Sequence, residues 1–257
     1  MVLNRAGMTT VPMETGTVSI AKLTGDVTAG WHGENAALSS SDPTFGQAVL
    51  RAKTVYDVAR LSVELAQDSE NIEGILQRSL TEKLAHAIDS AGLVGISTDA
   101  AAAPGGVFDL DGRSIIDTVG EPANYDHLLD GYYGLLSSDV SESAIGAAIA
   151  HPKYWRKMAG FKTGISGDQT TLAMPPEIAR LPKFKTTAAP LDGSTAKIVM
   201  GAWADLLYGV RLQLQVRVLQ EAYLGSNLQL GIIAYARCDF VATRPAAFCT
   251  IEDIDLS

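Results

Sequence analysis

The chain has few of the residues on which common metal and disulfide sites depend. Its 257 residues include two cysteines and four histidines. No two histidines lie three to five residues apart, the spacing at which paired zinc ligands usually occur. Two cysteines are too few for a disulfide scaffold. Because Cys238 and Cys249 lie in apolar runs, we expect buried free thiols in a reducing compartment, with a disulfide or a reactive thiol as the alternatives.

Signatures of catalysis and membrane insertion are also missing. The sequence holds no phosphate-binding loop, no dinucleotide fingerprint and no serine-nucleophile motif. The segment from Asp109 to Gly112 only partly matches a calcium loop, and we interpret it as a turn. No apolar run approaches the roughly 18 residues of a membrane span. We therefore expect no catalytic residue, no cofactor, no metal and no membrane contact.

Positive charge is scarce, since 29 acidic residues face 20 basic ones and the net charge is −9. This balance argues against a protein whose main task is to bind nucleic acid tightly, because such surfaces are usually basic. The stretch from Lys153 to Lys162 mixes basic and aromatic residues. It is interpreted as an amphipathic helix with a solvated basic face, with a nucleic-acid patch as the alternative.

Two strand-like segments, residues 17–23 and 45–61, flank a polar stretch that has little apolar character. Such a pattern predicts a long two-stranded ribbon, which is marginally stable in water on its own. We expect the ribbon to lie on another subunit, the alternative being a flexible surface hairpin. Trp31 and Phe45 favour the interface, because aromatic residues are enriched there.

A long helix is predicted over residues 70–93, where apolar side chains recur at helical spacing. Asp68 and Ser69 are expected to cap it, and Gly92 and Gly95 to end it. Further helices are expected over residues 126–137 and from Pro152 onward. Strands are expected over residues 196–200, 210–218, 228–240 and 246–251.

Three blocks in this order carry a family resemblance: Trp31 with Glu34, SDPTFG at 41–46, and SVELAQDS at 62–69. They resemble the major capsid protein of tailed bacteriophages, of the Hong Kong 97 type. Looser matches follow at residues 201–211, at 237–239 and at 245–248.

The resemblance implies an α+β capsid fold with an extended β-ribbon arm, a peripheral domain and an axial domain. It implies these boundaries: an N-terminal segment at 1–16, the ribbon arm at 17–54, the peripheral domain with its long spine helix at 55–123, the axial domain at 124–195, and completing strands at 196–257. It also implies that four ribbon residues form a subunit interface: Trp31, Glu34, Asp42 and Phe45.

The implied function is a shell subunit of a phage or prophage that self-assembles into hexamers and pentamers around DNA, without sequence-specific binding. Portal and scaffold proteins are the expected partners, and the virion capsid, assembled in the host cytoplasm, is the expected location. The alternatives are an encapsulin-type bacterial nanocompartment and a soluble enzyme without a recognisable motif.

One departure concerns covalent crosslinking, which some shells of this type achieve through a lysine–asparagine bond. The lysine in those shells precedes the SDPTFG-like block, whereas residues 35–40 here contain no lysine. We therefore predict a shell without isopeptide crosslinks.

Overall fold

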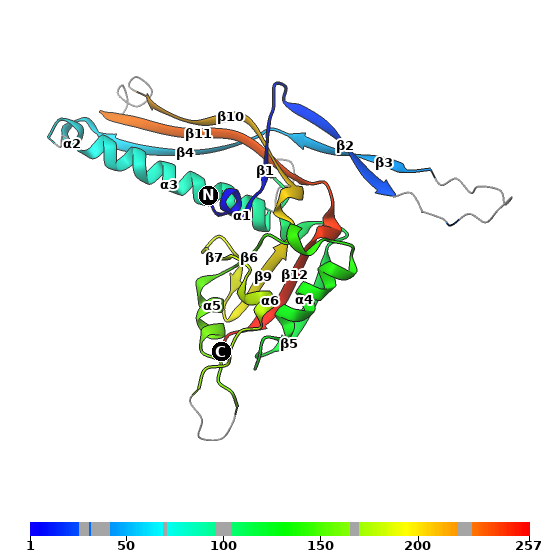
Figure 1. Ribbon diagram of the computed structural model, residues 1–257. Coiled ribbons are helices and arrows are strands. Elements are labelled where there is room, and N and C mark those ends of the chain that lie inside the picture. The colour runs from blue at the N-terminus through cyan, green and yellow to red at the C-terminus, as the bar shows by residue number, and fades with distance from the viewer. Residues whose placement is uncertain (26–30, 32–41, 69–70, 96–103, 165–169, 220–227) are drawn as a thin grey trace.

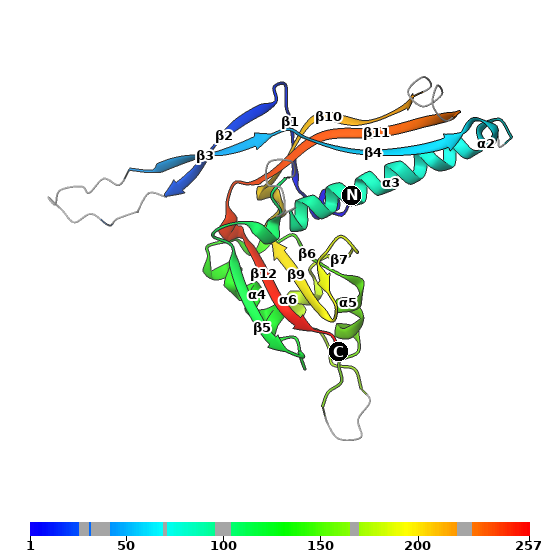
Figure 2. The same ribbon diagram turned by 180° about the vertical axis from the view of Figure 1, so that it is seen from behind.

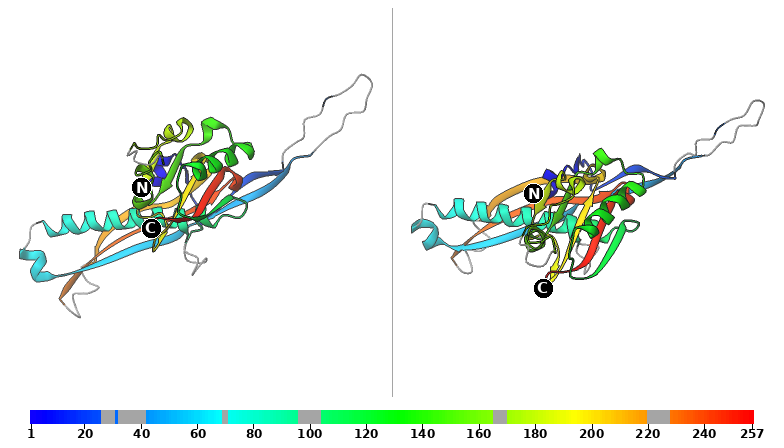
Figure 3. Two further views of the ribbon diagram at one scale, coloured as in Figure 1. Left: turned by 90° about the horizontal axis from the view of Figure 1, so that it is seen from below. Right: turned by 60° about the horizontal axis from the view of Figure 1, so that its bottom comes forward.

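A computed structural model describes residues 1–25, 31, 42–68, 71–95, 104–164, 170–219 and 228–257. They form a four-stranded sheet, a six-stranded sheet below it, and a two-stranded arm that extends from the upper sheet (Figures 1 and 2). This mixed architecture confirms the predicted α+β class. Seen from below, the arm and the start of helix α3 (Ile72–Val94) lie at opposite ends of the molecule (Figure 3).

The upper sheet is built around one long hairpin. Its strands, in order, are β1 (Thr9–Pro12), β10 (Leu206–Leu219), β11 (Gln229–Ala242) and β4 (Lys53–Ser62). The short first strand runs parallel to β10, and the other neighbours are antiparallel. Helix α3 (Ile72–Val94) packs along β11 and β4, with a shorter helix α2 (Val63–Asp68) before it. Leu80 and Leu84 of α3 form a small buried cluster with Ile232 and Ala234 of β11.

The ends of α3 correct two expectations. The helix begins after Asn71, and Asp68 belongs to α2, so the predicted cap by Asp68 is wrong, while Ser69 lies outside the described residues. Gly95 ends the helix with a positive φ of 74°, as expected. Gly92 lies inside the helix. A side chain at this position would approach Leu3 Cδ1 of α1 to 2.5 Å, so only glycine leaves room for Leu3. That glycine permits close packing and is no stop signal.

The lower sheet has five strands in a row and a sixth at its side. They are β5 (Ser114–Gly120), β12 (Phe248–Asp255), β9 (Thr195–Gly201), β6 (Ala147–Ala150) and β7 (Lys183–Lys185), with β8 (Leu191–Asp192) paired to β9. Its helices are α4 (Asp126–Ser137), α5 (Pro152–Ala159) and α6 (Pro176–Ala179). The start of α5 is capped by His151, whose Nδ1 accepts from the Lys153 N–H at 3.2 Å. This matches the helix predicted from Pro152.

The two sheets share one continuous core. The chain passes between them through three short 3₁₀ helices and their neighbours: η1 (Val107–Asp109), η3 (Trp203–Asp205) and η4 (Pro245–Ala247). A fourth, η2 (Glu142–Ala144), joins α4 to β6 within the lower body. Helix α1 (Val2–Ala6) joins this core through the fully buried Leu3. Its first N–H groups are satisfied by Asp89 of α3, which accepts from Val2 at 2.7 Å and from Leu3 at 3.2 Å.

The arm consists of β2 (Thr17–Gly25) and β3 (Thr44–Arg51), paired antiparallel. The sequence predicted one strand over residues 45–61, and the structure divides that segment at Ala52 into β3 and β4. The break has a physical cause, because the backbone changes partners there. Arg51 N–H donates to the Asp239 carboxylate at 2.6 Å, and Ala52 N–H donates to the Gly16 carbonyl at 2.9 Å. The following residues pair with β11 instead of β2.

Candidate functional site: the two-stranded arm

Burial falls steeply along the arm. Ala48 and Leu50 near its base are buried, because Leu50 packs against Gly209 of β10, where a side chain would approach Leu50 Cδ1 to 3.0 Å. Phe45 at the far end of β3 is 70% exposed, and Leu23 of β2 is 50% exposed. The base of the arm is therefore anchored to the body, while its far end presents uncovered apolar surface.

The exposed apolar residues of the arm lie together. Leu23 and Phe45 are direct partners in the antiparallel register of β2 and β3. One position further out, the Thr24 hydroxyl donates to the Thr44 carbonyl at 3.0 Å and holds the two strands together. Opposed side chains on a ribbon lie about 5 Å apart, so the two apolar groups form one continuous patch.

The structure places three of the four predicted interface residues. Trp31 is fully exposed, Asp42 is exposed just before β3, and Phe45 belongs to the apolar patch. Glu34 lies outside the described residues. Sequence reasoning missed Leu23, because its partnership with Phe45 depends on the strand register. The interface role of all these residues stays a prediction.

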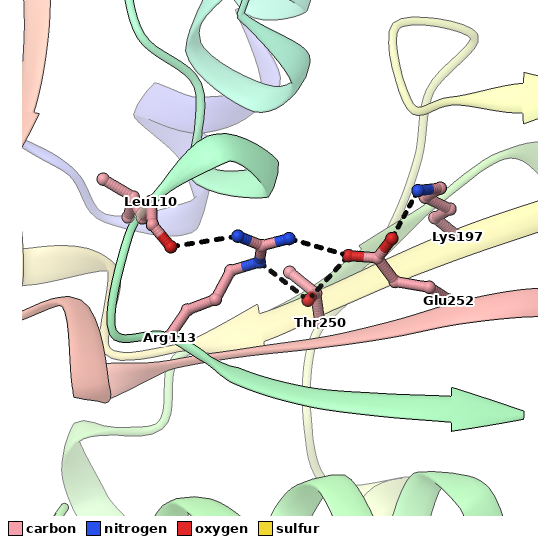
Figure 4. Close-up of polar contacts among 5 residues, drawn as sticks. All are labelled: Leu110, Arg113, Lys197, Thr250 and Glu252. Carbon is pink, nitrogen blue, oxygen red and sulfur yellow. Dashed lines mark hydrogen bonds and ion pairs between the residues drawn. The ribbon is translucent and has the colours of Figure 1, made fainter.

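A second group that the sequence did not reveal is a charged network on the lower sheet (Figure 4). Arg113 donates to Glu252 Oε1 at 2.9 Å and to the Thr250 hydroxyl at 3.0 Å, and Lys197 donates to the other Glu252 oxygen. A third Arg113 bond reaches the Leu110 carbonyl at 2.9 Å. The network ties the turn before β5 to β12 and β9.

In this network two cations, Arg113 and Lys197, share the single carboxylate of Glu252. Burial alone would raise the pKa of Glu252, but hydrogen bonds from Lys197 and Arg113 outweigh it, and the pKa lies below its ordinary value. The carboxylate is thus ionised at neutral pH and fully engaged. An arrangement of this kind fixes strands in place and offers no activated nucleophile or base.

The remaining candidates for chemistry are buried and partnered. Among the described residues, no three side chains of the metal-binding types gather into a site. Cys238 and Cys249 are buried free thiols, as predicted, and burial raises the pKa of Cys238 to about 11. His127 is buried, its Nε2 lies 2.8 Å from the Tyr154 hydroxyl, and burial lowers its pKa to about 4. No helix in the described part of the chain is long and apolar enough to cross a bilayer.

Comparison with known proteins agrees with this arrangement. The sequence matches the phage capsid family over residues 1–253. No curated protein sequence matches the chain. Among solved structures, the capsid of a native GTA particle shares 18% identity over 97% of this chain and 89% of that one, with a TM-score of 0.77.

Two structures from mycobacteriophages are equally similar in fold. The chain from Mycobacterium phage Adephagia is 14% identical over 97% of this chain and 88% of its own, with a TM-score of 0.79. The chain from Mycobacterium phage Cain is 16% identical over 99% and 90%, with a TM-score of 0.77. At such low identity these likenesses establish a common fold that spans nearly the whole chain.

Proposed function

The chain belongs to the phage capsid family, and from that premise we propose that this major capsid protein assembles into hexamers and pentamers in which the β2–β3 arm of each copy lies across a neighbouring copy. The shell is part of the virion.

One observation carries the proposal: the outer part of β2 and β3 exposes an apolar patch that its own subunit covers only in part. Phe45 and Leu23 are 70% and 50% exposed, and they lie opposite one another. An isolated two-stranded ribbon is marginally stable in water, and it gains stability when its apolar face packs on another surface. A neighbouring copy is the surface that a self-assembling shell supplies.

We further propose a purely structural role with no enzymatic activity. The shell encloses DNA without reading its sequence, it meets portal and scaffold proteins, and it assembles in the host cytoplasm. The net charge of −9 supports this reading, because a surface that binds nucleic acid tightly is usually basic. The charged network around Glu252 and the buried thiols supply no reactive group that an enzyme would need.

Negative-stain microscopy combined with sedimentation velocity tests the assembly. We expect rings or closed shells, more readily at higher ionic strength, because salt screens the repulsion between subunits of like charge. A monomer that persists at high protein concentration at every salt concentration would overturn the proposal. Purified particles that contain an enzyme in place of DNA would contradict the proposed contents.

Mature particles should dissolve into single subunits on a denaturing gel. Residues 35–40 contain no lysine that could form the isopeptide bond. Stability must therefore come from packing and from overlap between subunits. A ladder of multimers that resists heat and reductant would show that another lysine forms the crosslink.

A further inference from the structure

Charge is divided unequally between two segments of the lower body. Residues 109–142 contain eight acidic residues and one arginine, a net charge of −7. Residues 151–185 contain seven basic residues and two acidic ones, a net charge of +5. In a chain with a net charge of −9, the second segment is a pronounced exception.

The two edge strands of the lower sheet come from these two segments, although the segments also meet each other at the Lys157–Glu121 and Arg180–Glu142 ion pairs. Strand β5 is one edge strand and β7 is the other. Helix α4 packs against β5, and α5 is attached to β7 by the Trp155 Nε1–H, which donates to the Phe184 carbonyl at 3.2 Å. Figures 1 and 2 show β5 with α4 on one side of the lower body and β7 with α5 on the other.

Internal ion pairs neutralise only part of this charge. Lys157 pairs with Glu121, and Arg180 pairs with Glu142. Five further charged residues are exposed and form no ion pair within the part of the chain that the structure describes: Asp117, Asp130, Lys153, Arg156 and Lys185. They define an acidic edge, with Asp117 of β5 and Asp130 of α4, and a basic edge, with Lys153 and Arg156 of α5 and Lys185 of β7.

The acidic edge also carries uncovered apolar surface. Ile115 of β5 is 50% exposed, and Tyr133 of α4 is 52% exposed. The two elements are in close contact there, because a side chain at Gly134 would lie 3.7 Å from Ser114 Oγ. Ile115 follows Ser114 on the strand and so points to the other face of β5, which means that the exposed apolar area is spread over the edge; protein interfaces combine such apolar area with polar and charged groups.

We propose that the acidic edge of one copy docks against the basic edge of the next copy in the ring. A contact between two different surfaces at opposite sides of one subunit is head-to-tail, and repeated rotation of such a contact closes a ring. The occupant is a second copy because the chain itself supplies both complementary charges. This inference rests on the proposed ring assembly and names the surfaces that form it.

Charge reversal at each edge tests the docking. Asp117→Lys/Asp130→Lys gives a subunit with two basic edges, and Lys153→Glu/Lys185→Glu gives one with two acidic edges. Each variant alone should lower the assembled fraction about ten-fold or more, because like charges then face one another. The control, Glu64→Lys/Glu73→Lys, makes the same charge change as the first variant at exposed positions on α2 and α3 beside the upper sheet. It should assemble like the unaltered protein, and circular dichroism verifies that all variants fold.

Mixing the two edge variants gives the sharper test. A basic-edged subunit can alternate with an acidic-edged one, so the mixture should recover assembly that neither variant shows alone. Strict alternation needs an even number of copies, so six-membered rings should form and five-membered rings should not. A chain that carries all four substitutions should assemble by itself, because its edges again have opposite charge.

The outcomes separate this inference from the proposed function. If the unaltered protein forms rings and both edge variants form them equally well, the edge docking is wrong while the assembly stands. If the unaltered protein never assembles, the proposed function itself fails. If Lys153→Glu/Lys185→Glu keeps its rings but loses packaged DNA, while Asp117→Lys/Asp130→Lys is unaffected, the basic edge faces nucleic acid and the docking proposal is overturned.

Discussion

Two aromatic side chains show how differently the body and the arm use apolar residues. Trp203 is almost completely buried between the sheets, where its Nε1–H donates to the Ala147 carbonyl at 2.9 Å and its ring meets Phe248 edge-on. Phe45 is 70% exposed at the outer end of β3, where its partner across the strands is Leu23. The first residue has its full set of partners within one subunit, and the second lacks them.

This difference separates the free energy of folding from the free energy of association. Burial of apolar area stabilises by roughly 25 cal/mol per Å², and in association part of this gain offsets the freedom of motion that the subunits lose. In the body that burial happens when the chain folds. In the arm it has to wait for another surface, so a change there should leave folding intact and weaken assembly.

The largest loss is expected from Trp203→Ala. The substitution opens a cavity between the two sheets and leaves the buried Ala147 carbonyl without its donor. Tryptophan-to-alanine changes in cores cost about 3–5 kcal/mol, and we expect a value in the upper part of that range. Urea unfolding of the isolated subunit measures it. A loss below about 1 kcal/mol would mean that the junction between the sheets contributes little to the fold.

Leu80→Ala should cost about 2–5 kcal/mol, because Leu80 is buried between α3 and β11. The matched control is Ile75→Ala on the same helix. Ile75 is 64% exposed, so its removal should change stability by no more than about 0.5 kcal/mol. Equal effects of the two substitutions would show that α3 is not packed on the upper sheet as described.

Sequence reasoning succeeded where a local pattern determines the structure. The apolar stripe predicted α3 to within two residues at its start, and the spacing in residues 126–137 predicted α4 with its observed bounds. Pro152 marked the start of α5 because proline fits the first turn of a helix. These signals depend on side chains that are neighbours in the sequence.

Features that depend on distant partners were not predictable. The break at Ala52 arises because Asp239, 188 residues from Arg51 in the sequence, accepts its N–H. The pairing of Leu23 with Phe45 requires the register of the arm, and the charged network joins Arg113 to Glu252 across 139 residues. The identity of an exposed residue says little about its neighbours in space, so only part of the candidate site could be proposed in advance.

The stability of the body should fall as the pH decreases from about 6.5 to about 4. Burial lowers the pKa of His127 to about 4 from its ordinary 6.5. Between these values the unfolded chain binds a proton that the folded chain does not, so the folded state loses up to about 3 kcal/mol. Below about pH 4 both states are protonated and this contribution stops changing.

Urea unfolding at a series of pH values measures that loss. His127→Gln should remove most of this pH dependence, because glutamine does not titrate. The matched control is His86→Gln, since His86 is exposed and its Nε2 lies 3.0 Å from the Thr187 hydroxyl. If His127→Gln keeps the full dependence, another group must account for the acid sensitivity.

The smallest effect on stability, and a large one on assembly, is expected from Phe45→Ala and from Trp31→Ala. Both side chains are exposed in the single subunit, so neither substitution removes packing within it, and stability should change by no more than about 0.5 kcal/mol. The yield of rings or shells should fall several-fold, because large aromatic residues often anchor interfaces. Tyr56→Ala is the control, since Tyr56 is a similarly exposed aromatic residue on β4, outside the arm.

Urea unfolding and particle yield, measured on the same preparations, show whether an arm substitution weakens folding or assembly. If an arm substitution unfolds the subunit while Leu80→Ala leaves it intact, the assignment of folding to the body and association to the arm is reversed.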